Sequence, residues 1–154
     1  MAGEKYGDKA VAKLLAWVQA QLPAQLRLVE TAQSLTTNSL TDPVDYVAAK
    51  VPEDYRSPLI QIYCDDGDST DPMNSLYRYR CTVHLGYCND ADPVGGQLFM
   101  RRYMTAMLDT IRTDRTFSGT VVMAIEGSQS FGSRKANSTT VYENDLAVEI
   151  TTRD

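Results

Sequence analysis

The sequence predicts one α+β domain, in which a mainly antiparallel or mixed β-sheet is flanked by an N-terminal helix, a short helix and one long helix. Three observations predict this class. Apolar residues recur at helical spacing near the N-terminus and again near residue 100. They alternate with polar residues in later segments, and 154 residues suit a single domain with one core.

The first predicted element is a helix over residues 8–22. Its apolar side chains share one helical face: Val11, Leu14, Leu15, Val18 and Leu22. Pro23 lacks the amide hydrogen that a helix interior needs, so we expect the helix to end there.

Two shorter segments follow this helix. Residues 26–32, LRLVETA, alternate in a way that favours a strand. In TDPVDYVAAK, Pro43 suits a first helical position and Pro52 lies beyond the end, so a short helix is predicted over 43–49.

A predicted hairpin contains the most acidic stretch of the chain. Residues 59–64 have apolar side chains on both faces, the pattern of a buried central strand. They lead into CDDGDSTDPMN, which carries Asp65, Asp66, Asp68 and Asp71. Gly67 has Ile62 five residues before it and Met73 six after it, where an EF-hand needs carboxylates. We interpret the stretch as a solvated, mobile connection near 65–75, with a weak divalent-cation site as the alternative.

The segment LYRYRCTVHLGY is the clearest predicted strand. Its apolar face consists of alternate residues: Tyr77, Tyr79, Cys81, Val83, Leu85 and Tyr87. The other face consists of Arg78, Arg80, Thr82 and His84, and we interpret His84 as an exposed strand residue.

A helix of about 18 residues is predicted next, ending near Thr113. Its apolar face comprises Met100, Tyr103, Met104, Met107, Leu108 and Ile111. Strands are predicted over 117–126 and 141–150. The intervening GSQSFGSRKANS is rich in Gly and Ser, which predicts an exposed, mobile loop over 127–138.

Composition narrows the function classes. Fifteen basic against 20 acidic residues give a net charge of −5, which opposes broad nucleic-acid binding. No apolar stretch approaches the ~20 residues that span a bilayer, and the start does not resemble a signal peptide, so we expect no membrane partner. The odd number of cysteines favours reduced thiols.

The candidate catalytic and metal-binding residues form no convincing site. Cys81, His84 and Cys88 have a zinc-like spacing, but strand alternation places Cys81 on the opposite face from the other two. A single histidine also leaves little material for a Ser-His-Asp catalyst. We therefore predict no enzyme, no catalytic residue, no metal and no cofactor. A small metal-binding or enzymatic α+β domain remains the alternative.

The order of these elements resembles that of the tail terminator and head-tail completion (neck) proteins of tailed bacteriophages. The segments RRYMTAMLDTIRTDRTFSGTVVMAI and NDLAVEITTR carry the resemblance, which covers roughly residues 58–151. It implies a structural virion protein that forms a homo-oligomeric ring, commonly a hexamer, on the tail tube. Such a ring ends tube growth and offers the attachment surface for the neck or connector. Another neck or tail-completion adaptor is the alternative.

The resemblance also implies partners and a location. The partners would be further copies of the chain, the tail tube protein and a neck, connector or sheath protein. The protein would be assembled in the host cytoplasm and would reside in the tail or neck of the virion. No specific nucleic acid is expected as a partner.

Two sets of residues are predicted to make these contacts. Opposite charges on two strands could meet between neighbouring subunits: Arg78 and Arg80 against Glu143, Asp145 and Glu149. In the predicted mobile loop, Phe131 is an apolar anchor, and Arg134 and Lys135 would meet carboxylates of a partner; the alternative is that Phe131 packs back on its own domain.

Overall fold

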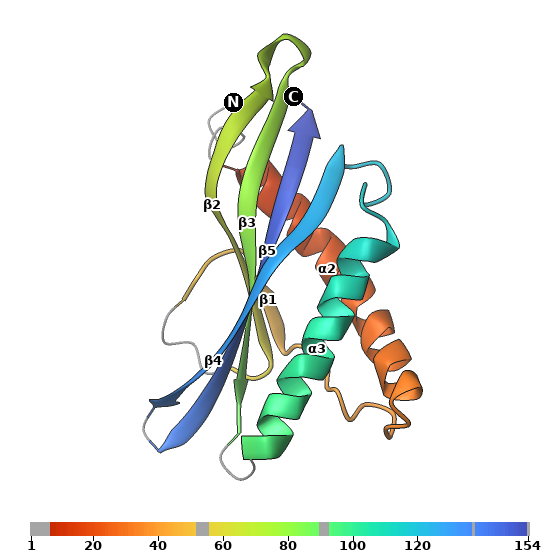
Figure 1. Ribbon diagram of the computed structural model, residues 1–154, viewed down its shortest axis with the longest axis vertical. Helices are drawn as coiled ribbons and strands as arrows, with labels where there is room; N and C mark the ends of the chain where they lie inside the picture. Colours follow the sequence, from red (N-terminus) through yellow and green to blue (C-terminus); the bar gives the residue numbers. More distant parts are fainter. Residues whose placement is uncertain (1–6, 52–55, 90–92, 137, 154) are drawn as a thin grey trace.

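The computed structural model describes residues 7–51, 56–89, 93–136 and 138–153. Two helices cover one face of a five-stranded mixed sheet (Figure 1), which confirms the predicted α+β class. The elements are α2 (Asp8–Ala32), β1 (Asp45–Val47), β2 (Leu59–Asp71), the 3-10 turn η1 (Pro72–Asn74), β3 (Leu76–Cys88), α3 (Pro93–Thr113), β4 (Met123–Ala136) and β5 (Thr139–Arg153).

The sheet has the strand order β1-β2-β3-β5-β4. β1 runs parallel to β2, and all other neighbours are antiparallel. The β2–β3 and β4–β5 hairpins turn at opposite ends of the molecule (Figure 1). Because β1 pairs only with residues 59–61 of β2, the rest of β2 forms one free edge of the sheet, and β4 forms the other.

Helix α2 continues through Pro23, so the predicted end at residue 22 is wrong, and so is the predicted strand over 26–32. Leu22, Leu26 and Val29 extend the apolar stripe and are buried in the core. Burying each such side chain contributes about 1.5–3 kcal/mol, and together they outweigh the ~3 kcal/mol cost of proline inside a helix.

Helix α3 confirms the predicted long helix, and it packs against α2. The indole Nε1 of Trp17 donates a hydrogen bond to the carbonyl oxygen of Thr110 at 2.8 Å. The same indole stacks on Phe117, with 5.3 Å between the ring centroids. At its other end α3 approaches β5 closely, because a Cβ on Gly96 would lie 2.5 Å from the Tyr142 ring.

Residues 43–49 do not form the predicted short helix, because residues 45–47 form strand β1 beside β2. The loop before β1 is fixed by the buried carboxylate of Glu30, which accepts a hydrogen bond from the Leu40 amide at 2.8 Å. Arg27 forms an ion pair with the same carboxylate at 2.7 Å. The loop is thus held at Leu40, five residues before β1 begins.

The aspartate stretch forms a hairpin, as predicted, but the carboxylates lie on strand β2 and not in the turn. Register shifts after Cys64 and Ser69 accommodate the extra residues. The turn is η1, capped by Asp71, whose carboxylate accepts hydrogen bonds from the Asn74 amide at 3.3 Å and from its side chain at 2.6 Å. The predicted loop at 65–75 is thus reduced to residues 72–75.

In the β4–β5 hairpin, too, a strand extends through a segment that was predicted to be a loop. Residues 114–122 form turns in which Asp114 accepts hydrogen bonds from the amides of Thr116 and Ser118, so β4 begins only at Met123. The predicted loop over 127–138 is wrong, because β4 continues to Ala136. The long strand β5, whose predicted core at 141–150 is confirmed, supplies the ladder that holds this Gly- and Ser-rich segment extended.

Candidate functional site

Two surfaces of the sheet remain accessible for function. We call the face covered by the helices the inner face and the opposite one the outer face. The outer face contains the charged residues of β3 and β5, and the free edge of β4 lies beside a groove next to α3.

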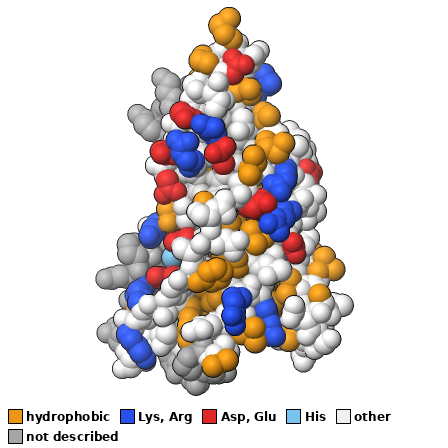
Figure 2. Space-filling view, viewed as in Figure 1, with side chains coloured by type: hydrophobic (Ala, Val, Ile, Leu, Met, Phe, Trp, Pro, Cys, Tyr) orange, Lys and Arg blue, Asp and Glu red, His pale blue; other side chains and the backbone are white. Residues whose placement is uncertain are grey.

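The upper part of the outer face is a network of exposed ion pairs. Arg78 lies 3.4 Å from Asp68 and 3.8 Å from Glu149, and Arg80 pairs with Asp66. In Figure 2, acidic and basic side chains lie side by side in the upper part of the view. Arg78, Arg80 and Glu149 were predicted to meet partners on a neighbouring subunit, but they find partners within one chain. Each exposed pair contributes only about 0–1 kcal/mol.

The lower part of the outer face is less exposed. His84 was predicted to be exposed, but only 9% of its surface is accessible. Lys50 and Val51, which follow β1, line the same cavity as His84. The Val51 amide and carbonyl both bond the side chain of Gln61, the register partner of His84 on β2, at 2.9 and 3.2 Å. The imidazole Nδ1 lies 2.6 Å from an oxygen of Asp145. This hydrogen bond lowers the pKa of Asp145, so the carboxylate stays ionised.

This His-Asp pair borders a cavity of about 230 Å³. The lining residues are Lys50, Val51, Leu59, Gln61, His84, Gly86, Arg134, Val141, Glu143 and Asp145. No serine, threonine or cysteine is among these described lining residues. Glu143 forms an ion pair with Arg134 at 2.9 Å. Glu143 and Asp145, the other predicted interface residues, thus also have partners within the chain.

The zinc-like and calcium-like patterns do not form ligand clusters. In the described ranges, no group of three or more His, Cys, Asp or Glu side chains could hold a metal ion. Cys81 is buried on the inner face beside Cys64, and burial raises the pKa of both thiols. Asp65, a candidate calcium ligand, instead accepts a hydrogen bond from the Thr82 hydroxyl at 2.6 Å.

The free edge of β4 exposes large apolar side chains at its start and near its middle. Val122 lies just before the strand, and Met123 and Ile125 lie on it; 39%, 39% and 48% of their surfaces are accessible. Phe131, predicted to be a docking anchor, is 52% exposed farther along the strand. Lys135 is exposed near the end of β4.

A groove of about 290 Å³ lies between α3 and the β4–β5 hairpin. It is lined by Gln97, Met100, Arg101, Phe131, Gly132, Ser133, Tyr142 and Asn144. In Figure 2, hydrophobic side chains gather in the lower half of the view, where these elements meet. Sequence reasoning found Phe131 but missed the rest of the groove. One signal was available: Asn144 is a polar residue on the apolar face of β5, and its side chain donates to the Met100 carbonyl at 3.0 Å.

Neither described helix has the length and apolar character needed to cross a membrane. No model of a known protein family matches the chain, and no curated protein matches it either.

Proposed function

We propose that the chain is a structural subunit of a bacteriophage tail, a tail terminator that assembles into a ring, commonly a hexamer, on the end of the tail tube. The ring ends tube growth and offers the attachment surface for the neck or connector. The protein would be assembled in the host cytoplasm and reside in the virion tail. The proposal is supported by the sequence resemblance and by one structural observation, the free β4 edge.

That edge is suited to contact with another chain. Edge strands have unpaired amides and carbonyls, and natural proteins usually protect them with charges or prolines. The first part of β4 instead presents Met123 and Ile125, next to Val122, to solvent. Exposed apolar residues that lie together in this way mark interaction surfaces.

The opposite edge of the sheet differs in character, and this difference favours a ring. The free part of β2 is acidic, whereas the first part of the β4 edge exposes the apolar side chains of Met123 and Ile125. Subunits in a ring touch head-to-tail, so each needs two unlike surfaces on different sides. A sheet with unlike free edges meets that requirement, and such an activity needs shape complementarity in place of catalysis.

The test combines light scattering with tube assembly. We expect purified protein, at low and high salt and with added tail tube protein, to form closed oligomers that stop tube elongation at substoichiometric amounts. Ile125→Arg should abolish the oligomer. Leu28→Arg is the matched control, because Leu28 is equally apolar and 61% exposed on α2.

Monomers in all of these conditions would refute the ring. Binding to tube ends without an effect on tube length would favour a neck or completion adaptor over a terminator.

A further inference from the structure

The tip of the β2–β3 hairpin carries the most exposed apolar side chain among those described. Met73 has 93% of its surface accessible. It lies in η1, where Asp71 caps the turn and the Arg153 guanidinium bonds the Asn74 carbonyl at 3.0 Å. Met73 is therefore presented on a turn held by side chains, so that binding would order little additional backbone.

We infer that Met73 of one copy docks in the groove of a second copy, between Met100 and Phe131. This inference rests on the proposed ring and specifies one of its contacts.

The groove fits this side chain in size and chemistry. Its volume of about 290 Å³ is about ten times the ~30 Å³ share of one water molecule, enough for an unbranched side chain. Phe131 and Tyr142 line the groove, and a methionine sulfur makes favourable contacts with aromatic rings. Docking would also cover Phe131, which is half-exposed in the single copy.

The charges beside the two surfaces are complementary. Residues 65–75 contain four aspartates and no basic residue. Asp66 and Asp68 pair with arginines of β3, whereas Asp71, two residues from Met73, forms no ion pair within the described ranges and is attracted only at longer range by Arg153. Hydrogen bonds from the Asn74 side chain lower the pKa of Asp71, which keeps it ionised. Arg101 at the groove is exposed and has no ion pair within the described ranges.

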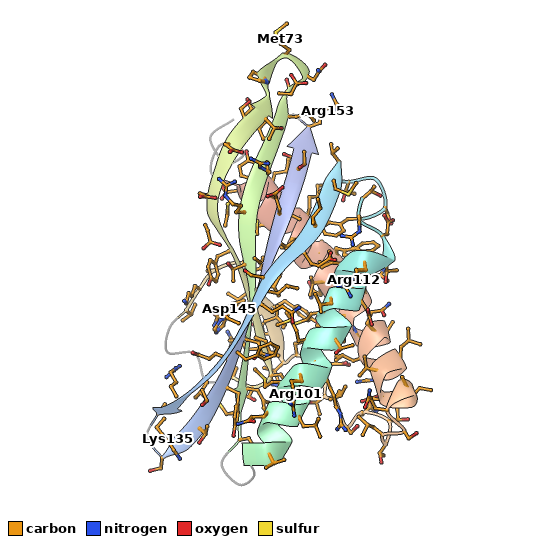
Figure 3. All side chains as sticks on the ribbon, viewed as in Figure 1. Met73, Arg101, Arg112, Lys135, Asp145 and Arg153 are labelled. Atoms are coloured by element: carbon orange, nitrogen blue, oxygen red, sulfur yellow. The ribbon has the colours of Figure 1, made fainter. Side chains whose placement is uncertain are left out.

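The contact must join two copies. Met73 and Arg101 lie at opposite ends of the molecule, and the β4–β5 hairpin that carries Lys135 lies at the Arg101 end (Figure 3). One chain therefore cannot bring its own tip to its own groove. The contact is head-to-tail, the type that closes into a ring when the rotation between copies fits.

Photo-crosslinking tests the contact directly. Benzoylphenylalanine is placed at position 73 of the full chain, and the crosslinked peptides are identified by mass spectrometry after illumination. We expect intermolecular crosslinks to residues 97–101 or 131–133. The same probe at position 44 is the control, because Val44 is also exposed, at 58%, but lies away from the tip. Crosslinks from position 73 that map elsewhere on the chain, or only to tube protein, would overturn the inference.

A second measurement separates this inference from the proposed function. Met73→Ala should raise the subunit dissociation constant about tenfold or more, because an anchor at the centre of a contact is lost. Val44→Ala should leave it unchanged. If Met73→Ala rings are as stable as wild-type rings, the inference fails and the ring stands. If the wild-type chain is a monomer with and without tube protein, the ring itself fails.

Discussion

The inner and outer faces of the sheet are built from alternate residues of the same strands, and they differ in what their side chains contact. On β3, Tyr79, Val83 and Leu85 are at most 2% exposed and pack in one core beneath the helices. Arg78 and Arg80, one residue away, form ion pairs with exposed carboxylates. The inner face therefore stabilises the fold, while the outer face and the edges are left free to evolve contacts.

Each face also holds ionisable side chains that depart from this division. On the outer face, His84 and Asp145 form a hydrogen-bonded pair beside Lys50 and Val51. At the inner face, the carboxylate of Glu126 accepts hydrogen bonds from Arg115 at 2.6 and 3.0 Å and from Arg112 at 3.0 Å. These partners explain how ionisable groups persist where solvent is limited.

The largest expected effect comes from the inner face. Leu146→Ala on β5 should lower the free energy of unfolding by about 2–5 kcal/mol, because it leaves a cavity beneath the helices. Urea denaturation measures the loss. Glu149→Ala, three residues along the same strand on the outer face, is the matched control, with an expected change below about 1 kcal/mol. Equal losses from the two variants would contradict the division between the faces.

An intermediate, pH-dependent effect is expected at Glu126. Hydrogen bonds from Arg115, opposed by burial and helped by Arg112, lower its pKa from 4.5 to about 2. Because the folded-state pKa is depressed, this stabilisation is present above about pH 4.5 and is lost as the pH falls towards 2.

Glu126→Gln should therefore reduce the free energy of unfolding by about 1–3 kcal/mol at pH 7. The difference from wild type should shrink towards pH 2, as measured by urea denaturation across this range. Glu149→Gln, whose side chain is 37% exposed, serves as the control and should show little difference at either pH. If the difference in the free energy of unfolding between wild type and Glu126→Gln stays constant with pH, Glu126 acts through packing alone.

The smallest effect is expected for the exposed ion pairs. Arg80→Ala should change the free energy of unfolding by less than about 1 kcal/mol, because its partners Asp66 and Asp68 remain hydrated without it. Thermal melting at low and high salt measures the effect. A loss above about 2 kcal/mol would mean that the outer face contributes to the fold as the inner face does.

Prediction from sequence was most accurate where one periodic pattern ran the length of an element. Strand β3 alternates without interruption, and α3 keeps a helical stripe from Met100 to Ile111, so both agree with the structure. Prediction failed where local propensity and tertiary partners disagreed. Pro23 lies inside a helix because its neighbours are buried against α3, and residues 127–136 are a strand because β5 supplies their hydrogen-bond partners.

For the candidate surfaces, too, single residues were predicted from sequence, but most of their contacts were not. Exposed Phe131 and the charges on β3 and β5 were named from sequence, and Arg78 was set against Glu149 as a contact between subunits, whereas the structure places these two side chains 3.8 Å apart within one chain. Arg134 pairs with Glu143 across a hairpin, and the groove combines residues of α3, β4 and β5. No local pattern encodes such contacts, because they depend on which strands are neighbours.

The amino-acid sequence by itself determined the α+β class, the order hairpin, helix, hairpin over residues 59–153, and which face of β3 and of α3 is apolar. These follow from side-chain periodicity, which each segment carries alone. Only the tertiary structure decided the length of α2, the extension of β2 and β4 through their polar halves, the enclosure of His84 and the groove beside Phe131. Each of these depends on burial or on backbone hydrogen bonds supplied by a segment distant in the chain, and such contributions outweigh local propensities of about 1 kcal/mol per residue.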